Sequence, residues 1–135
     1  MTDALSIAVS GLLAQGTRLS ATADNIANAT TGGVVPGTTS VSGAAGTVYK
    51  PLKVTFTSLE SGGVAAQAIP DPKGYSVAYD PSSPYANGQG QVAVPNVSLT
   101  REAVNLIETR LLYKANLSVI KTQDQMLGDL LNTIA

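Results

Sequence analysis

The sequence predicts a mainly α fold in which two long helices, one at each end of the chain, pack as a coiled-coil-like pair. A small β module of short strands is inserted between them. In residues 98–135, apolar side chains recur at alternating spacings of three and four, and Leu5, Leu12, Leu19 and Ile26 lie seven residues apart. Both spacings place apolar side chains on one face of a helix, whereas the middle of the chain is rich in Gly and Pro.

These patterns divide the 135-residue chain into three segments. Residues 1–33 form an N-terminal axial helix, residues 34–97 a middle loop with the β module, and residues 98–135 a C-terminal axial helix. The two helices together make one discontinuous domain, because each has an apolar face that needs a partner.

The first helix is expected over residues 4–29. Asn25 and Asn28 predict its end, because an Asn amide can bond the last helical carbonyls and a following Gly supplies left-handed backbone. Small side chains on the flanks of this helix let a second helix approach closely. They are Ala8, Ser10, Ala14 and Ala21.

The middle segment predicts a loop and several short strands. Residues 34–47 are rich in Gly, Ser and Thr and read as a flexible or weakly extended loop. Apolar and polar side chains alternate over 48–59, which predicts a strand, and a Gly pair then turns the chain into a second strand over 64–69. Further extended stretches are expected at 75–79 and 92–94.

The C-terminal helix starts after Asn96 or Ser98, either of which can cap it. Its heptad pattern, joined to that of the first helix, predicts an assembly seam. The seam consists of Leu5, Leu12, Leu19, Ile26, Leu106, Leu117, Ile120, Leu127 and Leu131. Arg110 and Asp124 occupy positions on this seam that normally hold apolar residues. They either extend to a solvated rim or fix the register between helices, and the pattern leaves both open.

The long helix also carries a polar and nearly uncharged stripe of side chains. A solvated helix face usually has more Lys and Glu, so this stripe suits a surface that meets water or a passing polypeptide without holding either. The stripe consists of Ser118, Thr122, Gln125, Asp129 and Asn132.

Composition argues against most classes of chemistry. The chain has neither Cys nor His, only 13% charged residues, and a net charge of −1. We therefore expect no catalytic residues, no metal or cofactor, no small-molecule substrate and no nucleic-acid partner. No apolar run reaches the ~20 residues of a membrane span, and the N-terminus does not predict a cleavable signal peptide.

Both ends of the chain resemble the bacterial flagellar rod and hook proteins. The segments that carry this resemblance are 7–15, 25–30, 105–108, 113–116 and 119–122. Within them, the residues that match the motif of the family are Asn25, Ala27, Asn28, Tyr113 and Asn116. In the middle, segments 49–51, 62–64, 79–84 and 95–97 are similar to those of a proximal rod member of this family.

The resemblance implies a structural subunit of the hollow periplasmic drive shaft of the flagellum. Its partners would be copies of itself, other rod proteins, basal-body ring components and the flagellar export apparatus, which would export it without a cleaved signal. On the polar stripe, Ser118, Thr122, Gln125 and Asn132 would then face the lumen. The alternatives are another axial protein of the rod or hook type, or a helical-hairpin adaptor or secretion substrate that forms no filament.

Overall fold

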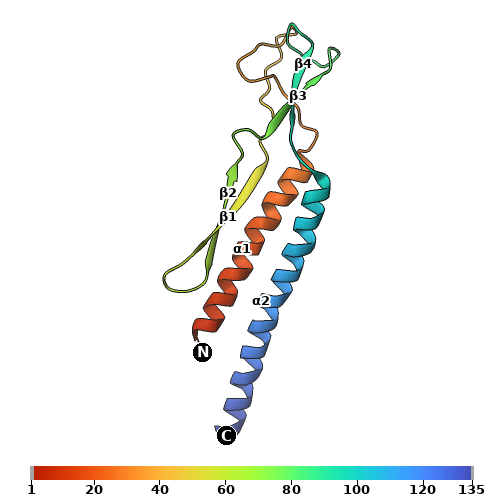
Figure 1. Cartoon of the computed structure of the whole chain (residues 1–135). Helices are drawn as coiled ribbons and strands as arrows, with labels where there is room; N and C mark the ends of the chain where they lie inside the picture. Colours follow the sequence, from red (N-terminus) through yellow and green to blue (C-terminus); the bar gives the residue numbers. More distant parts are fainter. Residues whose placement is uncertain (1, 135) are drawn as a thin grey trace. The chain divides into compact units, whose positions relative to one another are not determined.

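The computed structural model describes residues 2–134 and contains two long helices with short antiparallel strands between them (Figure 1). The elements in chain order are α1 Thr2–Ala27, β1 Leu52–Ser58, β2 Val64–Pro70, β3 Tyr75–Tyr79, β4 Gln91–Pro95 and α2 Leu99–Ile134. The predicted helices and all four extended stretches are confirmed, although β1 begins four residues later than expected. Coiled-coil packing of the helices is not confirmed.

The chain forms two compact units, to which both helices contribute. The first consists of Met1–Ser20, Val54–Ala68 and Val104–Ala135, and the second of Ala21–Lys53 and Ile69–Ala103. The predicted three-segment division stays a prediction.

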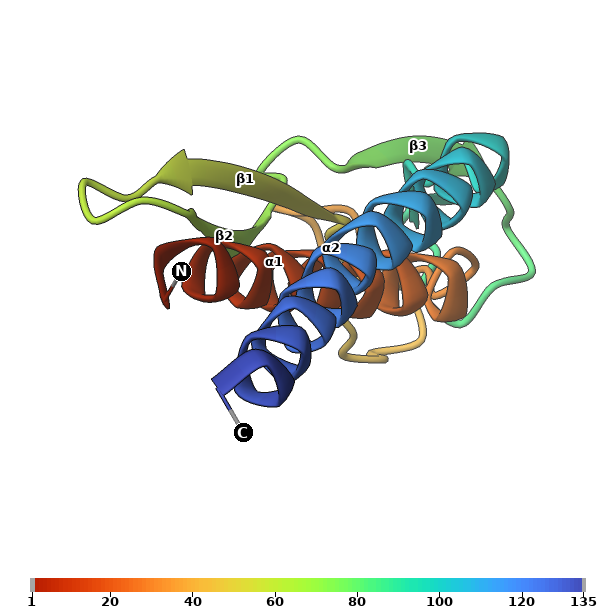
Figure 2. The ribbon, with the colours of Figure 1, turned by 90° about the horizontal axis from the view of Figure 1, so that it is seen from below.

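In the first unit, α1 lies between α2 and the β1–β2 hairpin (Figures 1 and 2). The two helices are antiparallel, because Arg18 reaches Glu108 whereas Gly11 lies against Asn116. On the other side of α1, the hydroxyl of Ser10 accepts a hydrogen bond of 3.1 Å from the backbone N–H of Val64. One polar side chain of α1 thus ties the start of β2 to the helix.

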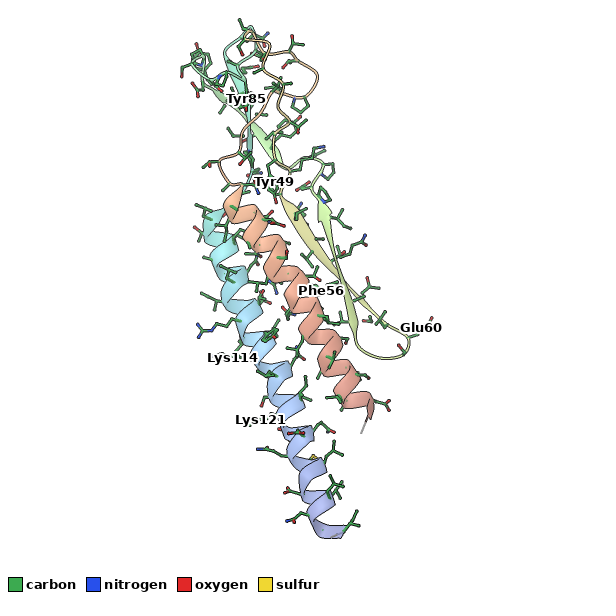
Figure 3. All side chains as sticks on the ribbon, turned by 180° about the vertical axis from the view of Figure 1, so that it is seen from behind. Tyr49, Phe56, Glu60, Tyr85, Lys114 and Lys121 are labelled. Carbon is green, nitrogen blue, oxygen red and sulfur yellow. The ribbon has the colours of Figure 1, made fainter. Side chains whose placement is uncertain are left out.

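The hairpin turn depends on its Gly pair. Gly62 and Gly63 have φ values of 85° and 92°, which only Gly adopts readily. The N–H of Leu59 donates to the carbonyl of Gly63 at 3.1 Å and closes the loop. Glu60 lies at the tip, and Phe56 lies on β1 beside α1 (Figure 3).

In the second unit, β3 and β4 pair as an antiparallel ladder from Tyr75 opposite Pro95 to Tyr79 opposite Gln91. Gly33 and Ala93 exchange two backbone hydrogen bonds of 2.9 Å each, so the segment after α1 extends this small sheet. Ala93 has no exposed surface and lies at the centre of the unit.

The expected left-handed Gly after α1 is wrong, because Gly32 and Gly33 are not among the Gly residues with positive φ. Gly33 is required for a different reason. A Cβ at this position would lie 2.4 Å from the backbone nitrogen of Val48, so only Gly lets the two backbone segments approach.

Two of the side chains suggested by the sequence, Asn28 and Ser98, bond the helix ends. The Nδ2 of Asn28 donates to the carbonyl of Asp24 at 2.9 Å, which satisfies one of the last acceptors of α1. At the start of α2, the hydroxyl of Ser98 accepts from the N–H of Arg101 at 3.4 Å, so Ser98 is the N-cap.

The loop before β1 is irregular and mostly exposed, as predicted. It is tied at two points. The N–H of Val41 donates to the carbonyl of Ala86 at 2.8 Å, and the hydroxyl of Ser42 donates to the carbonyl of Pro84. Among the described helices, none has a stretch that is long and apolar enough to cross a membrane.

Candidate assembly surface

Asn25 is a buried polar node of the second unit. Its Nδ2 donates to the carbonyl of Leu52 at 3.0 Å and to a carboxylate oxygen of Glu102 at 3.1 Å. Its Oδ1 accepts from the N–H of Leu52 at 2.7 Å and from the hydroxyl of Tyr49 at 3.0 Å. One amide therefore pairs with both backbone groups of the first residue of β1 and joins α1 and α2 to that strand.

The electrostatics of this node keep the Tyr49 hydroxyl protonated. Partial burial raises the pKa of Tyr49, and the nearby carboxylates of Asp24 and Glu102 raise this pKa further. The phenol stays a hydrogen-bond donor to Asn25 because its ionised form would be desolvated and repelled.

In the first unit, small and polar side chains lie where the helices meet. Ala8, Gly11 and Ala14 are buried on α1. A Cβ on Gly11 would lie 2.8 Å from the amide of Asn116, which itself donates to the carbonyl of Leu112. This close approach explains why a residue without a side chain occupies position 11.

A charged cluster adds to the same contact. Nη2 of Arg18 donates to a carboxylate oxygen of Glu108 at 2.6 Å and to Oδ1 of Asn105 at 3.1 Å. The hydrogen bond and charge of Arg18 lower the pKa of Glu108. In the second unit, Lys53 acts in the same way on Asp71, whose pKa its hydrogen bond lowers.

The seam residues are not buried between the two helices of one chain, so their pairing is not confirmed and the assembly seam stays a prediction. Leu5, Leu19 and Leu117 remain 39%, 49% and 50% exposed. Their exposure follows from the small contact residues, because backbones that approach closely leave the larger side chains at the margins. Ile26, Leu127 and Leu131 are also exposed, whereas Leu12, Leu106 and Ile120 are half-buried.

Most of these seam residues line two apolar grooves of the first unit. The first, which we call the Leu5 groove, has a volume of about 590 Å³. It is lined by Leu5, Leu117, Ile120, Lys121, Gln123, Asp124 and Leu127. Its walls come from the start of α1 and from α2, and Lys121 points its amino group away from α1 (Figure 3).

The second, which we call the Tyr113 groove, has a volume of about 400 Å³. It is lined by Gln15, Gly16, Leu19, Leu106, Thr109, Arg110 and Tyr113. Arg110 and Asp124 therefore lie one in each groove, and both are exposed. Their register role stays a prediction.

The residues of the polar stripe are exposed along α2. The hydroxyl of Thr122 donates to the carbonyl of Ser118, and that of Thr133 to the carbonyl of Asp129. Their placement toward a lumen is not tested by a single chain and stays a prediction.

Sequence reasoning missed the role of Asn25, which it treated as part of a helix stop. Ser10, which was expected on the flank that a second helix approaches, instead ties β2 to α1. The signal lay in Ala8, Gly11, Gln15 and Arg18, whose spacing of three and four places them on one face of α1, separate from Leu5, Leu12 and Leu19. Gly and Ala on one line indicate close backbone approach, and polar residues on the same line indicate a buried network.

The ends of the chain match two family models. Residues 5–33 match the model described as "Flagella basal body rod protein", and residues 89–133 match "Flagellar basal body rod FlgEFG protein C-terminal". The fold and both matches place the chain among the flagellar basal-body rod proteins.

Proteins that are similar over nearly the whole chain show which kind of rod protein it is. The chain is 37% identical over 127 residues to the flagellar basal-body rod protein FlgC of Yersinia enterocolitica, covering 90% of this chain and 88% of the relative. It is 34% identical to FlgC of Salmonella typhimurium, with the same coverage, and 34% identical to FlgC of Agrobacterium fabrum, covering 90% and 86%. The chain belongs to the FlgC family of flagellar basal-body rod proteins. The predicted resemblance is confirmed, and the function is that of a structural rod subunit.

Proposed function

We propose that this subunit assembles helically with copies of itself and with other rod proteins to form the hollow periplasmic drive shaft. The observation that carries this proposal is the pair of apolar grooves in the first unit. Exposed apolar surface of this extent on a chain with few charges needs a protein partner. The predicted seam residues that line both grooves supply the contact.

The role is structural rather than catalytic. The chain has no Cys or His, and among the described residues no group of acidic side chains is arranged to hold a metal ion. The buried polar groups at Asn25 are used in hydrogen bonds between elements. We propose that the chain is exported by the flagellar export apparatus without a cleaved signal, and that basal-body ring components contact it in place.

The test is incorporation into basal bodies in a strain that lacks the endogenous subunit. Leu117→Asp places a charge in the Leu5 groove, where binding of a partner would bury it at high cost. We expect loss of motility and absence of the variant from isolated basal bodies, while circular dichroism of the purified chain remains unchanged.

Val41→Asp is the matched control, because Val41 is 76% exposed in the second unit and lines neither groove. It should be incorporated normally. Normal incorporation of Leu117→Asp would contradict the proposal. A wild-type chain that stays monomeric at all concentrations and is absent from basal bodies would instead favour the adaptor alternative.

A further inference from the structure

Two opposite charges lie on one face of α2 and form no ion pair with another described residue. Arg110 lines the Tyr113 groove and Asp124 the Leu5 groove. In the described part of the chain, the ion pairs are Arg18–Glu108 and Lys53–Asp71, and neither Arg110 nor Asp124 takes part in one. The two are 14 residues apart, which is two heptads and about 21 Å along a helix.

Two residues that line the Tyr113 groove, Gln15 and Thr109, each have a buried oxygen without a hydrogen-bond partner among the described residues. Oε1 of Gln15 and Oγ1 of Thr109 make no hydrogen bond, although these residues are only 8% and 3% exposed. An unpaired buried polar atom destabilises the chain unless a bound group supplies a hydrogen bond. The groove therefore fits an occupant that carries apolar side chains and a carboxylate, with a hydrogen-bond donor for a Gln15 or Thr109 side chain that turns toward it.

The chain itself carries an element with this chemistry. Around the Leu5 groove, α2 presents Leu117, Ile120 and Leu127 together with Gln123 and Asp124. The amide of Gln123 makes no hydrogen bond to another described residue, so it is available as a donor. Gln123 follows Thr109 by 14 residues, the same interval that separates Asp124 from Arg110.

We propose that the Tyr113 groove binds α2 of a second copy of this chain, in parallel and shifted by 14 residues. Asp124 of the second copy then pairs with Arg110, and its Gln123 lies at the level of Thr109. The apolar side chains around that Asp124 fill the space between Leu19 and Leu106. This inference rests on the proposed function, because it specifies how copies meet within an assembly.

An antiparallel pair of α2 helices would also join Arg110 to Asp124, once at each end of a symmetric dimer. Both pairs would then be used within the dimer, so no further copy could be added. In the parallel, shifted arrangement, the Tyr113 groove of one copy binds the part of α2 that lines the Leu5 groove of the next copy. Each added copy therefore leaves one Tyr113 groove unoccupied at one end of the series and one such part of α2 unbound at the other. Such a head-to-tail contact produces an open series of copies, as a rod requires. Rod assembly therefore favours the parallel arrangement.

Cross-linking tests the arrangement directly, because the natural chain contains no Cys. In the double variant Arg110→Cys/Asp124→Cys, a short bismaleimide is too short to join the two thiols along one helix. Treated basal bodies should show a ladder of dimers, trimers and larger species. Arg110→Cys/Asp129→Cys is the control, because Asp129 belongs to the polar stripe, and it should give no ladder.

Dimers without larger species would overturn the parallel shift in favour of the closed pair. Absence of cross-links in basal bodies that contain the double variant would overturn the inference and leave the proposed function intact. Failure of the proposed function has a different signature, since the wild-type chain would then be missing from basal bodies.

Charge exchange tests the ion pair. Arg110→Glu and Asp124→Arg should each lower incorporation by about tenfold or more, because each leaves like charges facing each other between copies. The combined variant Arg110→Glu/Asp124→Arg should restore incorporation. Unimpaired single variants, or a double variant no better than either single variant, would show that these residues do not pair between copies.

Discussion

The side chain of Asn25 connects three elements, so its removal should have a larger effect than that of a neighbouring Asn. Its amide bonds both backbone groups of Leu52 as well as Tyr49 and Glu102. Ala at this position would remove the partner of both backbone groups of Leu52 and of the Tyr49 hydroxyl, all of them shielded from water in part. Burying an unpaired polar group costs roughly 1–3 kcal/mol.

We predict that Asn25→Ala lowers the free energy of unfolding by roughly 2–4 kcal/mol, which is the loss expected from two or more orphaned groups. Asn28→Ala removes a single bond to the carbonyl of Asp24 and should cost about 0.5–1.5 kcal/mol. Urea unfolding followed by circular dichroism measures both. Equal losses for the two variants would contradict the central role of Asn25.

The raised pKa of Tyr49 predicts a loss of stability at alkaline pH. Because the pKa is raised in the folded chain, the stabilisation is complete below the ordinary phenol pKa of about 10 and is lost as pH rises through the folded value. Tyr49→Phe should therefore be less stable than wild type at pH 8, by about 0.5–1.5 kcal/mol for one hydrogen bond.

Above the ordinary phenol pKa, the difference between wild type and Tyr49→Phe should shrink, because the ionised phenol faces Asp24 and Glu102. Urea midpoints at pH 8 and pH 11 provide the comparison. Tyr79→Phe is the control for loss of a phenol hydroxyl, since Tyr79 is 76% exposed. If the stability difference between wild type and Tyr49→Phe were the same at pH 8 and pH 11, the prediction would be contradicted.

At the scale of the elements, the close approach of α1 and α2 depends on Gly11. A Cβ there would meet the amide of Asn116 at 2.8 Å, whereas a Cβ on Gly16 would meet nothing within 4 Å. Gly within a helix costs about 0.5–1 kcal/mol relative to Ala. Ala at either position gains helix propensity, but only Ala at position 11 meets a neighbouring helix. Comparing the two substitutions therefore distinguishes the effect of propensity on stability from that of packing.

We predict that Gly16→Ala raises the free energy of unfolding by about 0.5–1 kcal/mol, whereas Gly11→Ala lowers it or leaves it unchanged. Gly11→Ala combined with Asn116→Ala should recover the gain, because the clashing amide is gone. Thermal unfolding of wild type and of these three variants measures this. An equal gain from both single Gly variants would mean that the helices do not approach closely at Gly11.

The loop before β1 should tolerate shortening. Residues 36–39 and 41–43 are exposed, and the loop is tied by Val41 and Ser42 to the segment 84–86. Deletion of residues 38–43 removes these ties but no buried side chain, so the free energy of unfolding should change by less than about 1 kcal/mol. Circular dichroism and limited proteolysis check this, and an unfolded or degraded variant would disprove it.

At the scale of the whole molecule, the polar stripe of α2 is predicted to face the lumen of the rod. Gln125 and Asn132 are exposed, polar and uncharged. Gln125→Leu/Asn132→Leu would give the lumen an apolar wall that retains passing unfolded chains. We predict that rods form at normal abundance and that export of later flagellar proteins falls.

The control for this prediction is Thr38→Leu/Gln89→Leu, which makes the same change in character at two exposed positions of the second unit. It should leave export unchanged. Absent rods, or normal rods with unimpaired export in the Gln125/Asn132 variant, would each show that the stripe has another role.

Much of this fold could be predicted from local pattern. Apolar spacing located both helices, alternation located the strands, and the Gly62–Gly63 pair located the hairpin turn. The motifs at the two ends of the chain were enough to indicate the family. These features depend on neighbours in the sequence, which is why periodicity and residue type were sufficient.

The partners of buried side chains were decided only by tertiary structure. The sequence shows an apolar line and a line of small and polar residues on α1, but not which of them faces α2. Close packing at Gly11 placed the line of small and polar residues inside and left Leu5 and Leu19 at groove walls. Likewise, Asn25 and Leu52 are 27 residues apart, and no local pattern specifies a hydrogen bond between positions that only the folded chain brings together.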